Sequence, residues 1–415
     1  MTPTLRTLGE FGAIDKIADA FGGRAPDEKG RRSRPGFRLL AGIGDDAAVF
    51  RWGGGKGAGE AGGGKKGSAG TPYDLLASAD LLVEGIHFDL SYTGLKDLGY
   101  KALQANLSDI AAMGGEPLFY LVSIAAPGGM DFRKLRALYS GMDEAGRESG
   151  IRLAGGDTSN TPGPIFINIS ITGRVEHGRA VMRSNARPGD GIWVTGTLGD
   201  SAAGLEILKA GMCLSSPPAA GRPAAGEGGA KRREKVEMKS LGPRHAGAGQ
   251  YLLSRHLRPQ ARIKAGRLLG KAGIATAMID ISDGISSDLL HILKASGAGA
   301  VIYEDRLPLS EELMAYAGRE RALDIALSGG EDYELLFTAR GRGEASRAVG
   351  RAGRGAQGVS TRGRQPTERL MAALGRRAKV TFTKIGEVLE TGSAYIESAG
   401  GKRRTLKAKG YKHFE

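Results

Sequence analysis

Two adjacent carboxylates, Asp45 and Asp46, lie in the glycine-rich stretch from Gly42 to Val49, between apolar residues that predict a strand on either side. No arginine or lysine lies within this stretch, and neighbouring carboxylates repel each other unless a cation joins them. Carboxylate oxygens suit Mg²⁺, which usually completes its octahedron with waters and substrate phosphates. A tight turn would use the same residue types. The pair alone therefore leaves both interpretations open.

Further aspartates follow glycines or predicted strands along the chain. Apolar residues before Asp80, Asp157 and Asp280 predict strands that end at these carboxylates, and α/β proteins place ligand sites at strand ends. If the carboxylates converge, several Mg²⁺ ions bridging a polyphosphate would remove their repulsion, as in phosphoryl transfer. The alternative is that each aspartate caps a helix or turn at the surface. The complete set comprises Asp45, Asp46, Asp80, Asp109, Asp157, Asp280, Asp283 and Asp288.

Phosphate binding here would not use a P-loop or a protein-kinase signature, since the sequence has neither. The backbone amides near Gly155 and Gly156 and the cation of Arg183 are candidates instead. His87 could contact an anionic substrate, although a lone histidine more often has a structural role. No convincing Cys-His or Ser-His pair is present, which argues against nucleophilic catalysis.

The elements that would position these residues alternate between strand and helix in both halves of the chain, which predicts an α/β or α+β protein of two domains. A helix over 95–113 carries Asn106 and Asp109 on one face. A connector over 183–190 places the boundary between domains 1–185 and 186–415. Other expected helices span 11–21, 132–149, 200–210 and 282–293, and expected strands span 73–80, 118–125, 151–154, 165–173, 191–196, 277–280 and 300–303. A further strand is expected after the acidic turn within 326–337, and 380–388 follows the last insertion.

Three stretches of low-complexity composition interrupt these elements, at 53–70, 213–245 and 340–379. They are rich in Gly, Ala and basic residues, and together they hold 23 of the 68 glycines of the 415-residue chain. Because they fall between motifs, we expect them to be surface insertions, with folded sequence resuming at Tyr251 after the second one.

The net charge of +14 raises the possibility of nucleic-acid binding. The positive charge is concentrated in 231–233 and 340–379, where no aromatic residues interleave with it, so no specific nucleic-acid partner is expected. A non-specific polyanion-binding protein is the alternative from a different functional class. The single cysteine, Cys213, excludes an internal disulfide and predicts a reducing compartment, the cytoplasm. No apolar run approaches the ~20 residues of a membrane span.

Eight motifs in order along the chain resemble the thiamine-monophosphate kinase family, and they reach both halves and the last residues. The wider superfamily that the chain resembles includes aminoimidazole ribonucleotide synthetase, selenophosphate synthetase and a hydrogenase maturation protein. This resemblance implies two α/β domains, of which the N-terminal one pairs in a homodimer through its sheet. The motifs are GIGDDAAV at 42–49, LVEGIHF at 82–88, ANLSDIAAMG at 105–114, AGGDT at 154–158, TGTLGDSAAGL at 195–205, DISDG at 280–284, SGGEDYE at 328–334 and GYKHF at 410–414.

The resemblance implies ATP-dependent phosphorylation of thiamine phosphate to thiamine diphosphate, with release of ADP, in thiamine diphosphate biosynthesis. No general base is assigned, because the acceptor phosphate has a second pKa near ~6 and is largely a dianion at neutral pH. By similarity, ATP would contact Gly156, Asp157, Arg183 and Ser282, and thiamine phosphate would contact His87, Glu331 and Tyr411. Several Mg²⁺ ions would be held by Asp46, Ser78, Ala79, Asp80, Asp109, Asp157, Asp280 and Asp283.

One departure from the family concerns Ser78-Ala79-Asp80, where family members often have Ser-Thr-Asp. A metal contact through the backbone carbonyl of Ala79 would survive this change, whereas a contact through a hydroxyl would not. Another ATP-using member of the superfamily is the alternative enzyme. Selenophosphate synthetase is disfavoured because it usually has a reactive cysteine or selenocysteine near its N-terminus, whereas Cys213 lies in a predicted loop.

Overall fold

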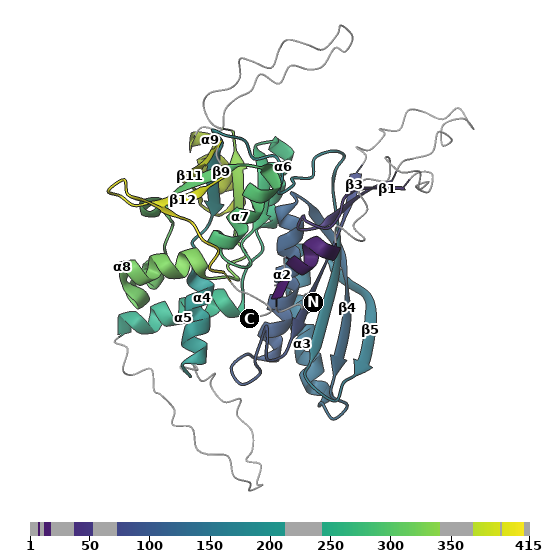
Figure 1. The fold of residues 1–415 in the computed structure, drawn as a ribbon. Coiled ribbons are helices and arrows are strands. Elements are labelled where there is room, and N and C mark those ends of the chain that lie inside the picture. The colour runs from purple at the N-terminus through teal and green to yellow at the C-terminus, as the bar shows by residue number, and fades with distance from the viewer. Residues whose placement is uncertain are drawn as a thin grey trace, which may run out of the picture.

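The computed structural model describes residues 7–8, 12–17, 37–52, 73–211, 243–340, 368–390 and 392–410. These residues form two mixed sheets, each with helices packed against it (Figure 1). The expected insertion at 53–70 lies outside the described residues, as do most of the other two. Residues 12–17, within the expected N-terminal helix, are helical. The fold class inferred from the sequence is confirmed, with two α+β halves.

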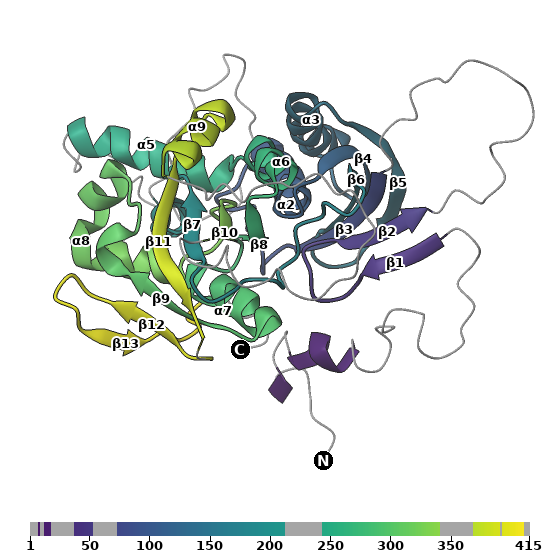
Figure 2. The same ribbon diagram turned by 90° about the horizontal axis from the view of Figure 1, so that it is seen from above.

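The first sheet has six strands in the order β1-β2-β3-β6-β4-β5, and every neighbouring pair is antiparallel except β4 with β5. Two helices cover one face (Figure 2). Strand β6 buries every second residue against these helices, among them Ile167, Ile169 and Ile171, because successive side chains of a strand point to opposite faces. The elements are β1 (Phe37–Ala41), β2 (Ala48–Trp52), β3 (Tyr73–Val83), α2 (Leu95–Ala112), β4 (Glu116–Ala126), α3 (Phe132–Ser149), β5 (Arg152–Asn160) and β6 (Phe166–Glu176).

The second sheet has seven strands in the order β13-β12-β9-β11-β7-β10-β8, and only β9 and β12 pair in parallel. Strand β7 sends Ile192 and Val194 into one apolar cluster and Trp193 into another, so both faces are covered. The elements are β7 (Gly191–Thr195), α4 (Asp200–Lys209), α5 (Pro243–Leu257), α6 (Ile263–Ala272), β8 (Ala275–Asp280), α7 (Ile285–Ser296), β9 (Gly299–Tyr303), η2 (Glu304–Arg306), α8 (Glu311–Ser328), β10 (Leu335–Ala339), α9 (Glu368–Ala378), β11 (Phe382–Leu389), β12 (Ala394–Glu397) and β13 (Arg403–Thr405).

Two of the expected insertions are shorter than the composition suggested. Helix α5 begins at Pro243, ahead of Tyr251, and buries Leu252. Helix α9 lies within the expected insertion 340–379 and buries Met371 and Leu374 against the second sheet. The prediction was wrong at these ends because a few apolar residues at helical spacing are enough to pack a helix, even where Arg and Gly dominate the composition.

Helix α2 is held closely on two sides by glycines. A Cβ atom on Gly99 of α2 would overlap the carbonyl oxygen of Leu138 in α3, and one on Gly141 of α3 would overlap that of Lys96 in α2. On its other side, a Cβ atom on Gly266 of α6 would overlap the carbonyl oxygen of Ala111. The last contact joins the two halves of the chain, so α2 is fixed relative to both sheets.

The strands of the first sheet end at Glu176 and those of the second begin at Gly191. The boundary expected between residues 185 and 186 falls in the segment between them and stays a prediction. Among the described residues, no helix is both long enough and apolar enough to cross a membrane.

We predict that Gly266→Ala lowers the free energy of unfolding by about 1–3 kcal/mol, because the added methyl group overpacks the junction with Ala111. Chemical denaturation followed by circular dichroism measures this change. The matched control is Gly247→Ala in α5, where a Cβ atom would meet nothing within 4 Å. This control should be neutral or stabilising by up to about 1 kcal/mol. Equal stabilities of the two variants would contradict close packing at the junction.

Candidate active site

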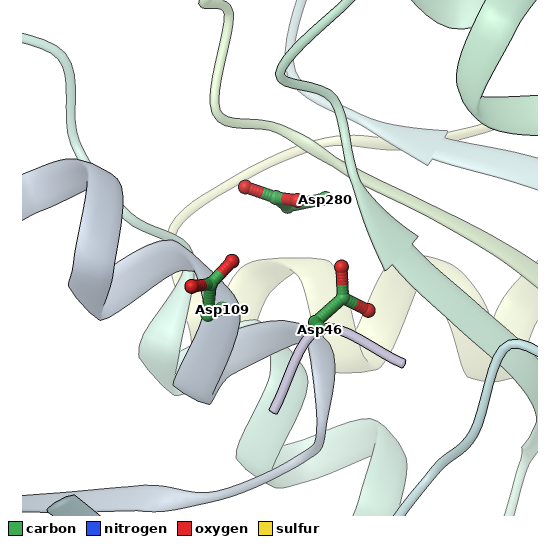
Figure 3. Close-up of side chains that lie close together, drawn as sticks. All are labelled: Asp46, Asp109 and Asp280. Carbon is green, nitrogen blue, oxygen red and sulfur yellow. The ribbon is translucent and has the colours of Figure 1, made fainter. Parts of the chain in front are cut away.

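Three carboxylates from distant parts of the chain meet where the two halves join. Asp46 precedes β2, Asp109 lies in the last turns of α2, and Asp280 is the last residue of β8. One oxygen of each lies within 4.8 Å of the others (Figure 3). Asp46 and Asp280 are buried. Both halves of the molecule therefore contribute to one acidic centre.

Ser78 and Asp80 extend this centre from β3. The hydroxyl of Ser78 donates a hydrogen bond of 2.5 Å to the carboxylate of Asp109. Asp80 shares the face of β3 that Ser78 occupies, because alternate residues of a strand point the same way. Ala79 lies between them on the opposite, exposed side. The structure thus gathers five of the residues predicted to surround metal ions: Asp46, Ser78, Asp80, Asp109 and Asp280.

The electrostatics of the centre reflect burial and the crowding of like charges. Burial and then Asp46 raise the pKa of Asp80 to about 6 and that of Asp280 to about 8. The pKa of Asp109 is raised well above its usual range by burial, with Asp80 and Asp280 as further causes. These carboxylates therefore resist ionisation together unless positive charge is added.

Arg183 supplies positive charge at one edge of the centre. Its guanidinium lies 2.7 Å from Asp46 Oδ1, and its backbone amide donates to Asp45 Oδ1 at 2.7 Å. Arg183 therefore contacts Asp45 and Asp46 through different groups, and a metal cation shared by the two carboxylates stays a prediction. Asp46 Oδ2 is buried and has no hydrogen-bond partner among the described residues. An additional cation would satisfy this oxygen.

The segment after β8 brings further predicted residues next to the centre. Asp288 in the first turn of α7 accepts a hydrogen bond of 3.0 Å from the amide of Gly284, so it holds this turn. Burial raises its pKa well above the usual range, with Asp283 as the next cause. The carbonyl of Ser282 accepts a hydrogen bond of 2.7 Å from the amide of Glu331. The loops that carry Ser282, Asp283 and Glu331 are therefore joined.

His87 and Glu331 are close enough to interact electrostatically, and their contacts with thiamine phosphate stay predictions. Burial raises the pKa of Glu331, but nearby positive charge outweighs burial and lowers the pKa below its ordinary value. Lys101 contributes most to this lowering, and His256 and His87 contribute less. The amide of Val83 donates to Nδ1 of His87 at 3.0 Å, which places the ring proton of a neutral His87 on Nε2. The backbone of Glu331 has a φ of +63°, an uncommon conformation for a residue other than glycine.

Tyr411 lies outside the described residues. The preceding residue, Gly410, packs so closely that a Cβ atom there would overlap the carbonyl oxygen of Asp283 and the hydroxyl of Ser287. The amide of Gly410 donates to Ser287 Oγ at 3.1 Å. The C-terminal segment therefore reaches the loop after β8, although its last described residue is one short of the predicted substrate contact.

Gly156 and Asp157 do not join the acidic centre in the single chain. They lie inside β5, where Asp157 pairs with Ser123 of β4 and Gly156 pairs with the buried Val122. Asp157 is exposed on the face of the sheet that points away from α2. Asp80, in contrast, pairs with the buried Ile169 and points toward α2. The two carboxylates are therefore on opposite faces of the same sheet.

The expectation that three aspartates end their strands is confirmed for Asp280 only. Asp80 and Asp157 lie within β3 and β5, which continue beyond them. The strand-end rule fails here because it describes parallel sheets, whereas the first sheet is mainly antiparallel. Asp80 lies at the centre because its side chain is on the face of β3 that points toward α2, and not because it ends the strand.

Two buried polar residues near Glu331 were not identified from the sequence, Lys101 of α2 and His256 of α5. Lys101 could have been identified as a buried charge, because it stands alone among Tyr100, Ala102 and Leu103 on the apolar part of a predicted helix. His256 gave no comparable signal.

Comparisons with known proteins agree with this architecture. Residues 44–175 match the AIR synthase related protein, N-terminal domain, and residues 187–398 match the corresponding C-terminal domain. The chain is 33% identical over 376 residues to the thiamine-monophosphate kinase of Bacillus subtilis, covering 90% of this chain and 93% of that one. It is 38% identical over 346 residues to the enzyme of Salmonella typhimurium, covering 82% and 86%.

Solved structures give the same result. AaThiL complexed with AMPPCP and TMP is 29% identical, with a TM-score of 0.69 over 100% of both chains. The thiamine-monophosphate kinase of Stenotrophomonas maltophilia is also 29% identical, with a TM-score of 0.61 over 94% of this chain and 96% of that one. With its two-half architecture and its acidic centre, the chain therefore belongs to the thiamine-monophosphate kinase family of AIR synthase related proteins.

Proposed function

We propose that this chain transfers the γ-phosphoryl group of ATP to thiamine phosphate, which forms thiamine diphosphate and ADP. The observation that carries the proposal is the acidic centre of Asp46, Asp109 and Asp280, which is built from both halves in a chain of this family. Its relative AaThiL is described with an ATP analogue and TMP bound. Phosphoryl transfer requires mainly positioning and neutralisation of charge, and the centre is suited to both.

The residues present fit Mg²⁺. Hard carboxylate oxygens converge at the centre, and the buried oxygen of Asp46 lacks a partner among the described residues. We propose that Asp46, Asp80, Asp109 and Asp280 hold Mg²⁺, with Ser78 orienting Asp109. Bound Mg²⁺ would neutralise charge on the phosphates of ATP and of the acceptor. Ala79, Asp157 and Asp283 stay further proposed contacts, Ala79 through its carbonyl.

The remaining predicted residues divide between the two substrates. Arg183 would contact ATP while it stays paired with Asp46, and Gly156 and Ser282 would offer backbone or hydroxyl groups to the nucleotide. His87 would donate from Nε2 to the thiamine phosphate, beside the carboxylate of Glu331. Tyr411 keeps its proposed contact with the same substrate. No residue has to remove a proton from the acceptor, because a phosphate dianion is already a nucleophile.

The direct test follows labelled phosphate from ATP into thiamine diphosphate, with ADP measured in parallel. We expect equal amounts of both products, formed only when Mg²⁺ is present. Asp109→Asn should lower kcat by about 10²-fold or more, since it removes a charge from the centre. The matched control Asp143→Asn changes a solvent-exposed carboxylate of α3 and should keep normal turnover. Normal turnover by folded Asp109→Asn would remove Asp109 from the proposed site.

The pH dependence of stability should reveal the metal site without any substrate. Because folding raises the pKa of Asp80 to about 6 and of Asp280 to about 8, the metal-free protein should lose stability as the pH rises between about 4 and 8. Mg²⁺ binds the ionised carboxylates and opposes this loss. We therefore expect Mg²⁺ to raise Tm more at pH 8 than at pH 6, measured by differential scanning calorimetry.

Asp280→Asn provides the matching variant for this experiment. Without Mg²⁺ its Tm at pH 8 should exceed that of the wild type, because one repelling charge is gone, and the increase caused by Mg²⁺ should shrink. Asp143→Asn should behave as the wild type. An Mg²⁺-induced increase that is the same at both pH values, or that persists in Asp280→Asn, would contradict the proposed ligands.

We further propose that two copies of the chain form a homodimer through the first sheet. The face of this sheet that turns away from α2 exposes large apolar side chains on β3 and β4, the two strands that flank β6: Leu81, Phe119 and Leu121 are 52%, 39% and 40% exposed. Large apolar side chains exposed together on one face of a sheet commonly mark a protein interface. A partner seated there would also cover Asp157, which belongs to the same face.

Leu121→Asp tests this interface, because burying a carboxylate opposite the apolar face of a second copy is unfavourable. We expect sedimentation velocity to give a dimer for the wild type and a shift toward monomer for Leu121→Asp. Phe132→Asp, at a side chain 73% exposed on α3, should leave the dimer intact. A monomeric wild type, or a dimer unaffected by Leu121→Asp, would contradict this proposal.

Two other expectations stay predictions. A cytoplasmic location was inferred from Cys213, which lies outside the described residues. Non-specific polyanion binding was inferred from basic stretches that are also mostly outside them. Deleting residues 341–367 should therefore leave the kinase reaction largely intact, whatever it does to affinity for polyanions.

A further inference from the structure

A buried polar cluster lies at the junction of the two halves, apart from the acidic centre. The ammonium group of Lys101 lies 2.7 Å from Glu331 Oε1 and 3.2 Å from His256 Nε2. Lys101 belongs to α2, whereas His256 and Glu331 belong to the second half. The side chains of Lys101 and His256 are 5% exposed, and that of Glu331 is 30% exposed. Of the three, Glu331 alone reaches a surface that a ligand can touch.

The hydrogen bonds define the charge of each member. An ammonium group only donates, so Nε2 of His256 must accept from Lys101, and the ring proton is then on Nδ1. This Nδ1 lies 3.1 Å from Ser201 Oγ and 3.6 Å from Glu331 Oε2. Burial, followed by the charge of Lys101, lowers the pKa of His256 to about 3, so His256 is neutral. The charged members of the cluster are therefore the buried Lys101 and the partly exposed Glu331.

Contacts to the backbone and to the side chain of Glu331 hold its carboxylate in place. Its amide donates to the carbonyl of Ser282, and its left-handed backbone conformation turns the side chain toward Lys101. Besides Lys101 and His256, the titratable groups that face it are His87, Tyr92 and Tyr333. Of these groups, Lys101 lowers the pKa of Glu331 most.

We propose that Lys101 is a positioning residue for the thiamine-phosphate end of the site, where it holds the carboxylate of Glu331 ionised and in one orientation across the junction. The inference rests on the proposed function and deepens it. Thiamine phosphate carries a permanently cationic thiazolium ring and an aminopyrimidine, and an ionised carboxylate suits either group. Lys101 is too deeply buried to touch the substrate, so it acts through Glu331.

Lys101→Met should raise KM for thiamine phosphate at least about tenfold, because Glu331 loses the buried cation that holds it, while KM for ATP changes little. Lys101→Arg keeps the charge in a different geometry and should give an intermediate KM. The matched control is Lys96→Met, on the same helix, where the lysine is largely exposed and paired with Glu144 at 2.8 Å. It should leave both KM values unchanged.

A pH profile separates positioning from a purely structural tie between the halves. In the wild type, Glu331 stays ionised between pH 6 and 9, so it should add little pH dependence to KM for thiamine phosphate. Without Lys101, burial would raise the pKa of Glu331, so the KM of Lys101→Met should fall toward the wild-type value as the pH rises. Lys101→Met combined with Glu331→Gln should lose this pH dependence. Equal increases in both KM values, or a flat profile for Lys101→Met, would overturn the proposal.

A measurement without substrate distinguishes failure of this inference from failure of the proposed function. If the wild type does not phosphorylate thiamine phosphate, the proposed function fails. The ion pair of Lys101 and Glu331 is then tested by its effect on Tm alone. Relative to the wild type, Lys101→Met should then lose Tm as the pH rises from 6 to 9, and adding Glu331→Gln should abolish this loss. Should Lys101→Met not fold, unchanged KM values in Lys101→Arg would overturn the inference.

Discussion

The mutual repulsion of buried carboxylates is the constraint around which this molecule is built. Asp46, Asp109 and Asp280 approach within 4.8 Å although each would be more stable apart. They stay together because the elements that carry them cannot separate easily. Helix α2 is packed through glycines against α3 on one side and α6 on the other. The stability of the packing thus offsets the cost of the charges, and the result is a centre prepared for cations.

The sequence was sufficient to predict the elements with strong periodicity. Helices over 95–113 and 132–149 agree with α2 and α3 to within one residue, because an apolar stripe at helical spacing identifies a buried face. It was less informative where composition concealed structure, as in α9, whose apolar residues stand among arginines and glycines. Strand ends were also predicted poorly, because the rule applied to Asp80 and Asp157 assumes parallel pairing.

The acidic residues of the site were predictable from their local motifs, but their partners were not. Arg183 and Asp46 are 137 positions apart, and no spacing rule connects them. The same holds for Lys101 and Glu331, which meet only because α2 lies against the second half. Motifs record which groups a site contains, whereas the pairing of buried charges depends on tertiary contacts. The separation of Asp157 from Asp80 by the thickness of a sheet is likewise invisible without the strand register.

Helix α2 carries both Asp109, at the acidic centre, and Lys101, which holds Glu331. Eight residues of α-helix at 1.5 Å per residue separate them by about 12 Å along the axis. With Asp109 at the phosphates and Glu331 at the cationic end of the acceptor, as proposed above, α2 would fix the distance between the two ends of the substrate. Adding or removing a single residue between positions 101 and 109 would turn Asp109 by about 100° around the helix axis relative to Lys101, so the two side chains would no longer both face their present partners.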